Sequence, residues 1–290
     1  MKFGLLFANT GPYVTPDGAA LIARTAEAAD YESLWTVEHV AVPVGYQSAY
    51  PYSDSGKMPG SEDSPIPDPL LWLSFVAAVT SRIRLCTGIL ILPQRHPIYT
   101  AKEIATLDVL SKGRMTLGIG IGWLEEEFRS LGIPFKERAG RTEECVAGLR
   151  SLWGQDASAF HGKYYDWDAL ESNPKPVQGQ DLPIVIGGHV EAAARRAARI
   201  GDGLFPALSD PKQLQALFDI VRDECDRIGR DPGEIELTAL ASIRQPEDIE
   251  KYARIGVTRI VSPTPLRGAE ELEERLEGFA NAVIRQVGPS

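Results

Sequence analysis

A glutamate–histidine pair, Glu38 and His39, directly follows a short apolar run at residues 33–37 and is the first candidate for chemistry. A histidine at the end of a buried strand can move a proton, or donate a hydrogen bond to a ligand, near neutral pH. An adjacent carboxylate can fix the tautomer of its ring. We therefore predict that His39 and Glu38 are catalytic; the alternative is a histidine that caps a helix or packs in the core.

A glycine-rich segment at residues 117–123 ends another apolar run and precedes three glutamates at residues 125–127. Alternate glycines, among them Gly120 and Gly122, allow a backbone to approach a ligand closely. Their spacing differs from that of the dinucleotide-binding fingerprint. The positive end of a helix dipole accounts for the glutamates, and their charge would oppose a phosphate at that helix.

A glycine pair, Gly187 and Gly188, follows the apolar run at residues 183–186 and is the better candidate for a phosphate site. Backbone N–H groups at the start of the next helix favour an anion, and His189 lies directly after the pair. The alternative is a glycine pair that only permits a tight turn.

Gly88 interrupts a third apolar run, and a glycine inside a strand often marks a bulge or the close approach of a ligand. His96 lies on the connection that follows this run, so we predict that it contacts the substrate. The alternative is a histidine that faces solvent.

Eight apolar runs alternate with helical patterns, which predicts parallel strands covered on both faces. We therefore expect an α/β fold, a single (β/α)8 TIM barrel over residues 1–290, with ligands at the C-terminal ends of the strands. A doubly wound open sheet is the alternative. Thr15–Pro16 and Asp210–Pro211 predict helix starts. The expected strands are residues 3–8, 33–37, 83–90, 115–121, 183–186, 203–206, 235–240 and 257–261.

Two connections are longer than ordinary links: residues 41–68, after the second strand, and residues 157–181, before the fifth. Loops of this length are usually lids, binding loops or disordered. Tyr46, Tyr50 and Tyr52 argue against disorder in the first, so we predict that it is a lid and that Tyr46 contacts the substrate. The second alternates like a small aromatic hairpin, which would either cap the barrel or form a substrate wall.

The chain has 290 residues, with 30 Lys and Arg against 40 Asp and Glu, and a formal net charge of −10. This balance disfavours nucleic acids and acidic membranes as partners, because both require a basic surface. The three cysteines are widely separated, so we expect neither a disulfide framework nor a metal site. We find no signal-peptide pattern and no apolar run of membrane length, and we predict a cytoplasmic protein.

Several stretches resemble the luciferase-like flavin and deazaflavin oxidoreductases, in particular their F420-dependent group. The resemblance implies a (β/α)8 barrel that binds F420 or FMN at its C-terminal rim, with a non-proline cis peptide at Gly88–Ile89. It runs essentially from end to end and is carried by residues 35–39, 92–97, 107–114, 118–128 and 200–203. With the candidates above, the predicted cofactor contacts are Ala8, Gly88, Ile89, Gly120, Gly122, Trp123, Gly187, Gly188 and His189.

In F420-dependent members, the histidine of an Asp–His or similar pair lies near the hydride-accepting edge of the central ring. The pair here is Glu38–His39, which is closer to the form in flavin monooxygenases. In some F420-dependent dehydrogenases the position of Trp123 holds an acidic proton acceptor, a role that tryptophan cannot fill. We therefore expect Trp123 to pack against cofactor or substrate, and we do not expect sugar-phosphate dehydrogenation by that mechanism.

The leading hypothesis is an oxidoreductase that uses coenzyme F420 for hydride transfer to or from a small organic substrate. The first alternative is an FMN-dependent luciferase-like monooxygenase that uses reduced flavin and O2. The second is a barrel that binds a flavin or another ligand without turnover, and the position of His39 argues against it.

The family resemblance also implies a homodimer formed by helices early in the barrel. Residues 69–79 are apolar nearly all round, whereas an outer barrel helix needs only one apolar stripe. Something must cover the surplus. We predict a second subunit in a two-fold interface; the alternative cover is the tyrosine-bearing loop of the same chain.

Overall fold

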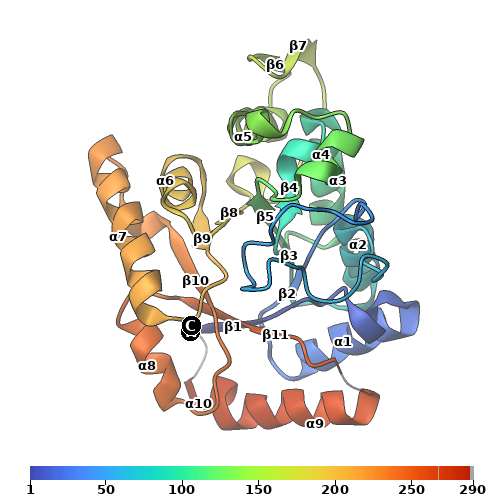
Figure 1. Cartoon of the computed structure of the whole chain (residues 1–290), viewed down its shortest axis with the longest axis vertical. Helices are drawn as coiled ribbons and strands as arrows, with labels where there is room; N and C mark the ends of the chain where they lie inside the picture. The colour runs from blue at the N-terminus through green and yellow to red at the C-terminus, as the bar shows by residue number, and fades with distance from the viewer. Residues whose placement is uncertain (267, 288–290) are drawn as a thin grey trace.

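A parallel β-barrel forms the centre of the molecule in the computed structural model, which describes residues 1–266 and 268–287 (Figure 1). Within these residues one nine-stranded sheet runs in the order β3-β2-β1-β11-β10-β9-β8-β5-β4, and pairing of β3 with β5 closes it. Because β3 and β4 are halves of one barrel strand, this described part contains the eight expected strands, and the (β/α)8 fold is confirmed. The barrel strands are β1 (Lys2–Leu6), β2 (Ser33–Thr36), β3 (Arg84–Thr87), β4 (Leu90–Ile91), β5 (Met115–Gly120), β8 (Ile184–Gly187), β9 (Gly203–Phe205), β10 (Glu236–Leu240) and β11 (Arg259–Pro263).

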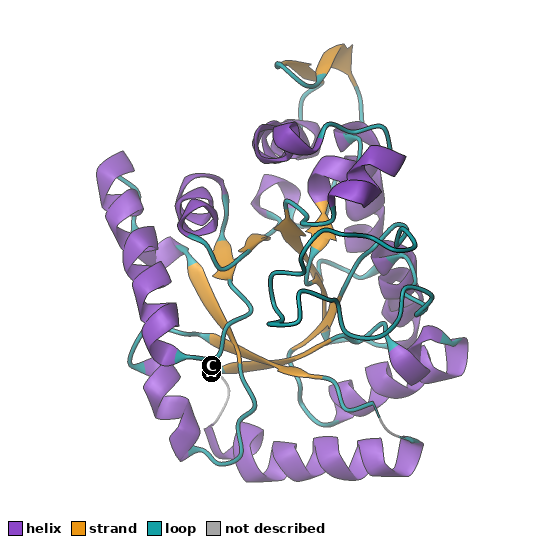
Figure 2. Ribbon diagram, in the orientation of Figure 1, coloured by secondary structure: helices purple, strands orange, loops and turns teal. Residues whose placement is uncertain are grey.

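Helices surround the barrel on its outside (Figure 2), as expected for strands whose outer faces are buried. Two begin at the predicted signals: Thr15 accepts the N–H of Gly18 at 3.2 Å, and the Asp210 carboxylate accepts the N–H groups of Lys212 and Gln213. No helix in the described ranges is long and apolar enough to cross a membrane. The helices are α1 (Pro16–Ala28), α2 (Pro69–Val79), α3 (Pro97–Leu110), α4 (Glu125–Ser130), α5 (Arg138–Trp153), α6 (Glu191–Ile200), α7 (Pro211–Ile228), α8 (Glu247–Ala253), α9 (Ala269–Phe279) and α10 (Arg285–Val287).

Trp35 fills the inside of the barrel. It is fully buried, and its ring centroid lies 5.3 Å from that of Phe205. Phe205 belongs to β9, which is separated from β2 by three strands of the sheet. A Cβ at Gly4 would lie 2.9 Å from its Nε1, and a Cβ at Gly88 would lie 3.1 Å from its Cε3. Glycine at both positions therefore makes room for the indole. Its Nε1 donates to Oγ of Ser33 at 2.8 Å, which satisfies the one polar atom of this ring.

The second long connection forms the expected hairpin, with β6 (Ser158–His161) antiparallel to β7 (Asp166–Leu170). Phe160 stacks on Trp167 at 4.9 Å, and Trp167 packs against Gly148 of α5, where a Cβ would lie 2.8 Å from the indole. The hairpin therefore covers the outer side of α5 (Figure 1). The alternative of a substrate wall does not agree with this position.

The tightest contact in the barrel wall predicts a strong effect on stability. A Cβ at Gly118 of β5 would lie 1.9 Å from the carbonyl oxygen of Thr87, a backbone atom that cannot move aside. We expect Gly118→Ala to lower the free energy of unfolding by about 3 kcal/mol, measured by urea denaturation. The matched control is Gly278→Ala, an exposed position of α9 at which alanine favours the helix. Equal stability of Gly118→Ala and the wild type would contradict the packing described for this strand.

Candidate active site

His39 lies just beyond the end of β2 and meets a carboxylate from another part of the barrel rim. Its Nδ1 is 3.1 Å from Oε2 of Glu127, in the first turn of α4. The other oxygen of Glu127 accepts the backbone N–H groups of Val40 at 2.7 Å and Ala41 at 3.1 Å. Because a carboxylate only accepts hydrogen bonds, we assign the proton of the neutral ring to Nδ1, and Nε2 keeps its lone pair for a ligand.

Glu127 is ionised in this setting although its side chain is only 1% exposed. Burial alone would raise its pKa, but the hydrogen bond and charge of His39, with the N–H of Ala41, hold the pKa below its ordinary value. We expected the helix dipole alone to explain the three glutamates at residues 125–127. For Glu127 this explanation is wrong, because its carboxylate also binds His39. The two partners are 88 residues apart, and no motif links them.

Glu38 makes its contacts away from His39. Its Oε2 accepts the N–H of Ile91 at 2.5 Å, and its Oε1 accepts Nε of Arg95 at 3.1 Å. The prediction that Glu38 fixes the tautomer of His39 is wrong, because Glu127 makes that contact. Glu38 instead ties the end of β2 to β4 through the N–H of Ile91, and it forms a buried ion pair with Arg95.

The peptide bond between Gly88 and Ile89 is cis, which confirms the expectation from the family resemblance. It lies between β3 and β4. The Ile89 side chain occupies the space that larger residues at two of the predicted glycines would need. A Cβ at Gly120 would lie 2.5 Å from it, and a Cβ at Gly187 would lie 2.6 Å from it. Packing against Ile89 therefore explains why these two positions are glycine. The predicted contact of the two glycines with a cofactor stays a prediction.

Gly188 has a φ of +128°, a conformation that favours glycine. Its N–H donates to the carbonyl oxygen of Phe205 at 3.3 Å, so this group is not available to a phosphate. The first turn of α6, which begins at Glu191, still presents N–H groups that lack partners within the helix. A phosphate contact at this segment stays a prediction.

Ala8 is fully buried just after β1, where its N–H donates to the carbonyl oxygen of Trp35 at 3.1 Å, and its cofactor contact stays a prediction. The next residue, Asn9, was missed in the sequence. Its side chain bonds to both backbone polar groups of Val37 at 2.9 Å and donates to the carbonyl oxygen of Pro67 at 3.2 Å. Asn9 thus joins β1, β2 and the loop that follows β2; the available signal was a polar residue directly after an apolar run.

His96 caps α3: its Nδ1 accepts the N–H of Ile98 at 3.3 Å, and its ring lies 5.8 Å from Tyr165 of the hairpin. The residue is exposed. These contacts agree with the alternative of a solvent-facing histidine, and contact with a substrate stays a prediction.

Residues 41–68, here called the rim loop, cross the mouth of the barrel (Figure 2). Tyr50 contacts Trp123, which follows β5, at 5.2 Å between ring centroids. Tyr52 contacts His189, which follows β8, at 4.8 Å. The rim loop therefore extends from the end of β2 over the ends of β5 and β8.

Glu126 fastens the rim loop to α4. Its carboxylate accepts the N–H of Gln47 at 2.8 Å, the N–H of Ser48 at 3.1 Å and the hydroxyl of Ser48 at 2.6 Å. The hydroxyl of Ser48 contributes most to these bonds, which together lower the pKa of Glu126 to about 2. The helix dipole therefore does not fully explain the glutamate at position 126 either, because this carboxylate also binds the rim loop.

Three residues near the mouth carry buried polar atoms that have no hydrogen-bond partner in the described part of the chain. These atoms are Nδ1 of His189, Nε of Arg138 and both amide atoms of Gln94, whose amide lies near the Glu127 carboxylate and helps to lower the pKa of Glu127. Buried polar groups are normally paired, so unpaired ones fit a ligand that has hydrogen-bonding edges. A flavin or deazaflavin cofactor has such a ring and an anionic tail, and these residues fit it. Across the described ranges, no group of three or more His, Cys, Asp or Glu is arranged to hold a metal ion.

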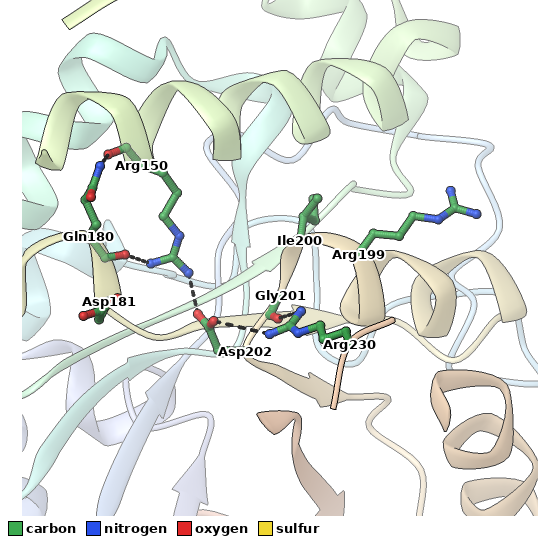
Figure 3. Close-up of a pocket in the computed structure, with 8 residues that line it drawn as sticks. All are labelled: Arg150, Gln180, Asp181, Arg199, Ile200, Gly201, Asp202 and Arg230. Carbon is green, nitrogen blue, oxygen red and sulfur yellow. Dashed lines mark hydrogen bonds and ion pairs between the residues drawn. The ribbon is translucent and has the colours of Figure 1, made fainter. Parts of the chain in front are cut away.

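A cavity of about 450 Å³ lies at the other end of the barrel, among residues that precede β8 and β9 (Figure 3). Arg150 pairs with Asp202 at 2.5 Å, and Arg230 approaches the same carboxylate at 3.9 Å. Arg150 also donates to the carbonyl oxygen of Leu182 at 2.7 Å. Because these charges are used within the chain, the cavity is not a second candidate for an anionic cofactor.

Comparisons with known proteins match residues 1–255 to the family model of luciferase-like monooxygenases. An uncharacterized protein of Mycobacterium tuberculosis is 31% identical over 281 residues, 97% of this chain and 98% of its own length. The FMNH2-dependent dimethylsulfone monooxygenase of Pseudomonas putida is 30% identical over 209 residues, 71% of this chain and 54% of its own length. The coenzyme F420-dependent tetrahydromethanopterin reductase of Methanopyrus kandleri shares the fold, with a TM-score of 0.78 at 19% identity over 98% of this chain and 99% of that one.

The Glu127–His39 contact predicts a pH-dependent stability. The pKa of Glu127 is lowered from 4.5, so its contribution is complete above that pH and is lost as pH falls through the folded-state pKa. We expect Glu127→Gln to lower the free energy of unfolding by about 2 kcal/mol at neutral pH, and the difference from the wild type to shrink in acid. Glu125→Gln, an exposed neighbour, is the control. Chemical denaturation across pH checks this, and a difference that is the same in acid and at neutrality would contradict it.

Proposed function

The chain belongs to the luciferase-like monooxygenase family, and from this membership we propose that it is an oxidoreductase that uses coenzyme F420 for hydride transfer to or from a small organic substrate. The pair formed by His39 and Glu127 is the observation that carries the proposal. Moving a hydride to or from a carbon that bears oxygen requires a proton to move at that oxygen. A histidine at the rim, oriented by a buried carboxylate, suits this task.

F420, when bound, supplies a ring that accepts or donates a hydride. Nε2 of His39 would take the proton from a substrate hydroxyl, or return it to a carbonyl, while Glu127 stabilises the charged imidazolium. Gln94, His189 and Arg138 would hold the cofactor through their unpaired buried atoms. The rim loop lies over these groups and would exclude water from the reacting atoms.

A second candidate is an FMN-dependent monooxygenase that uses reduced flavin and O2. The name of the Pseudomonas putida relative supports it, although this chain spans only 54% of that protein. A barrel that binds a flavin without turnover is the third candidate. The carboxylate-oriented His39 argues against that one, because binding alone does not require such a pair.

Titration of the purified protein with F420 and with FMN separates these candidates. We expect F420 to bind in the nanomolar-to-micromolar range and FMN to bind far more weakly, each followed through the absorbance of the cofactor. Tight binding of FMN alone would support the monooxygenase instead. Binding of neither would contradict both catalytic proposals.

Replacing the proposed proton carrier tests the chemistry. We expect His39→Ala to lower turnover by roughly 10²–10⁴-fold, the range of a positioned acid or base, while cofactor affinity changes much less. His161→Ala provides the matched control, because His161 is an exposed hairpin residue paired with Asp166. Steady-state kinetics measure both variants. Unchanged turnover in His39→Ala would remove this residue from the mechanism.

We also propose that the chain forms a homodimer through α2 and α3, which pack against each other. Leu71 and Phe75 of α2 are 75% and 42% exposed, and Tyr99 and Leu110 of α3 are 74% and 63% exposed. The rim loop thus leaves these side chains uncovered, which disagrees with the alternative that it covers α2. A two-fold contact would bring the same apolar patch onto itself.

Light scattering at micromolar concentration is expected to give the mass of a dimer. Leu71→Glu with Phe75→Glu is expected to give a monomer, because it buries carboxylates in the interface. Val177→Glu, at a position that is 62% exposed on a different connection, serves as the control. A monomeric wild type would overturn the assignment.

A further inference from the structure

Four aromatic side chains form a continuous cluster at the mouth, here called the aromatic wall: Tyr46, Tyr50, Tyr52 and Trp123. Trp123 lies 5.6 Å from Tyr46 and 5.2 Å from Tyr50, and Tyr50 lies 5.4 Å from Tyr52. The edge of the wall reaches the proposed proton carrier, because the rings of Trp123 and His39 are 5.7 Å apart. A molecule that reacts beside His39 therefore meets the wall.

Part of this aromatic surface is accessible. Tyr46 is buried at 4% exposure, whereas Tyr50 and Trp123 are half-buried and Tyr52 is 45% exposed. The wall thus has one ring that anchors it and three that offer surface to a ligand. Aromatic rings contact one another best in offset or edge-to-face arrangements at the centroid separations found here.

Two charged side chains contact the wall or its backbone, Lys57 and Glu126. Nζ of Lys57 donates to the carbonyl oxygen of Tyr46 at 2.9 Å and lies 4.2 Å from the centroid of its ring. The Glu126 carboxylate accepts from Gln47 and Ser48. The Lys57 cation thus lies against the buried ring of the wall, and a charged substrate on the accessible rings would lose water there, which is costly.

We propose that the substrate is an uncharged, planar organic molecule that stacks against the aromatic wall. The inference rests on the proposed function for the place where the substrate reacts, and it adds the chemical class. The accessible rings offer aromatic surface to a planar ring, whereas the Lys57 cation lies over the buried ring of Tyr46. A saturated ring of equal size would bind more weakly, because it makes no aromatic contact. A planar ring with a carboxylate would also bind more weakly, because the carboxylate loses its hydration.

Glu126 is the positioning residue of the wall. It holds the backbone at Gln47 and Ser48, midway between Tyr46, which is anchored on Trp123, and Tyr50. In Glu126→Gln a single amide oxygen replaces the two carboxylate oxygens, so these N–H groups and the Ser48 hydroxyl can no longer all keep an acceptor. The accessible part of the wall then shifts, although the barrel beneath it is unchanged.

Calorimetric titration of the cofactor-loaded protein with three matched probes tests the substrate class. The probes are naphthol (planar and uncharged), naphthoate (planar and charged) and decahydronaphthol (uncharged and not planar). We expect naphthol to bind about fivefold more tightly than decahydronaphthol and at least about tenfold more tightly than naphthoate. Naphthoate binding as tightly as naphthol, or no binding of naphthol up to its solubility, would overturn the proposal.

Variants connect this selectivity to the wall. Tyr50→Leu and Glu126→Gln are each expected to weaken naphthol binding by about 2- to 10-fold, with cofactor affinity and unfolding temperature unchanged. The controls remove a ring from the outer hairpin, Phe160→Leu, and a neighbouring carboxylate of α4, Glu125→Gln, and should leave naphthol binding unchanged. Naphthol affinity that is unchanged in Tyr50→Leu contradicts the wall as its binding surface.

Cofactor loading is read from the absorbance of the cofactor in the same samples. Failure of the wild type to load would contradict the proposed function. The three probe affinities would still decide the substrate class in that protein. Loaded protein that prefers naphthoate would contradict the substrate class and leave the proposed function standing.

Discussion

The hydrogen bond between His39 and Glu127 joins two parts of the barrel rim that are distant in the chain. The orientation of the Glu127 carboxylate in this bond is fixed, because its second oxygen accepts the N–H groups of Val40 and Ala41. The segment that carries the histidine is thus fastened to the carboxylate that orients it. Glu126, one position earlier, fastens the rim loop to the same turn of α4. One short helix, α4, therefore positions both His39, the proposed proton carrier, and the rim loop.

This arrangement depends on a barrel that is packed tightly on its inside. Trp35 occupies the centre, and glycines at positions 4 and 88 leave it room. The cis peptide before Ile89 lies where one barrel strand is divided, and that side chain packs against two further glycines, Gly120 and Gly187. Glycines at the rim thus reflect the close approach of neighbouring strands. The ligand site that we propose lies above them, among the side chains of the βα connections.

The sequence was sufficient for elements whose signals are local. Continuous apolar runs predicted the eight strands, and an N-cap residue before proline at Thr15 and Asp210 predicted two helix starts that the structure contains. The sequence could not predict that Glu127 is the partner of His39, because this contact depends on how α4 is rotated against a segment 88 residues earlier. The adjacent Glu38 looked like the partner in the sequence. Successive side chains of an extended segment point to opposite sides, and Glu38 pairs with Arg95.

The tautomer of His39 tests the central claim most directly. The chain has four histidines, so their side-chain nitrogens can be assigned by nitrogen NMR with single substitutions. At a pH where the ring is neutral, we expect a proton on Nδ1 of His39 and a lone pair on Nε2, with this preference lost in Glu127→Leu, which has no acceptor. A proton on Nε2 in the wild type, or a tautomer that does not depend on Glu127, would contradict it.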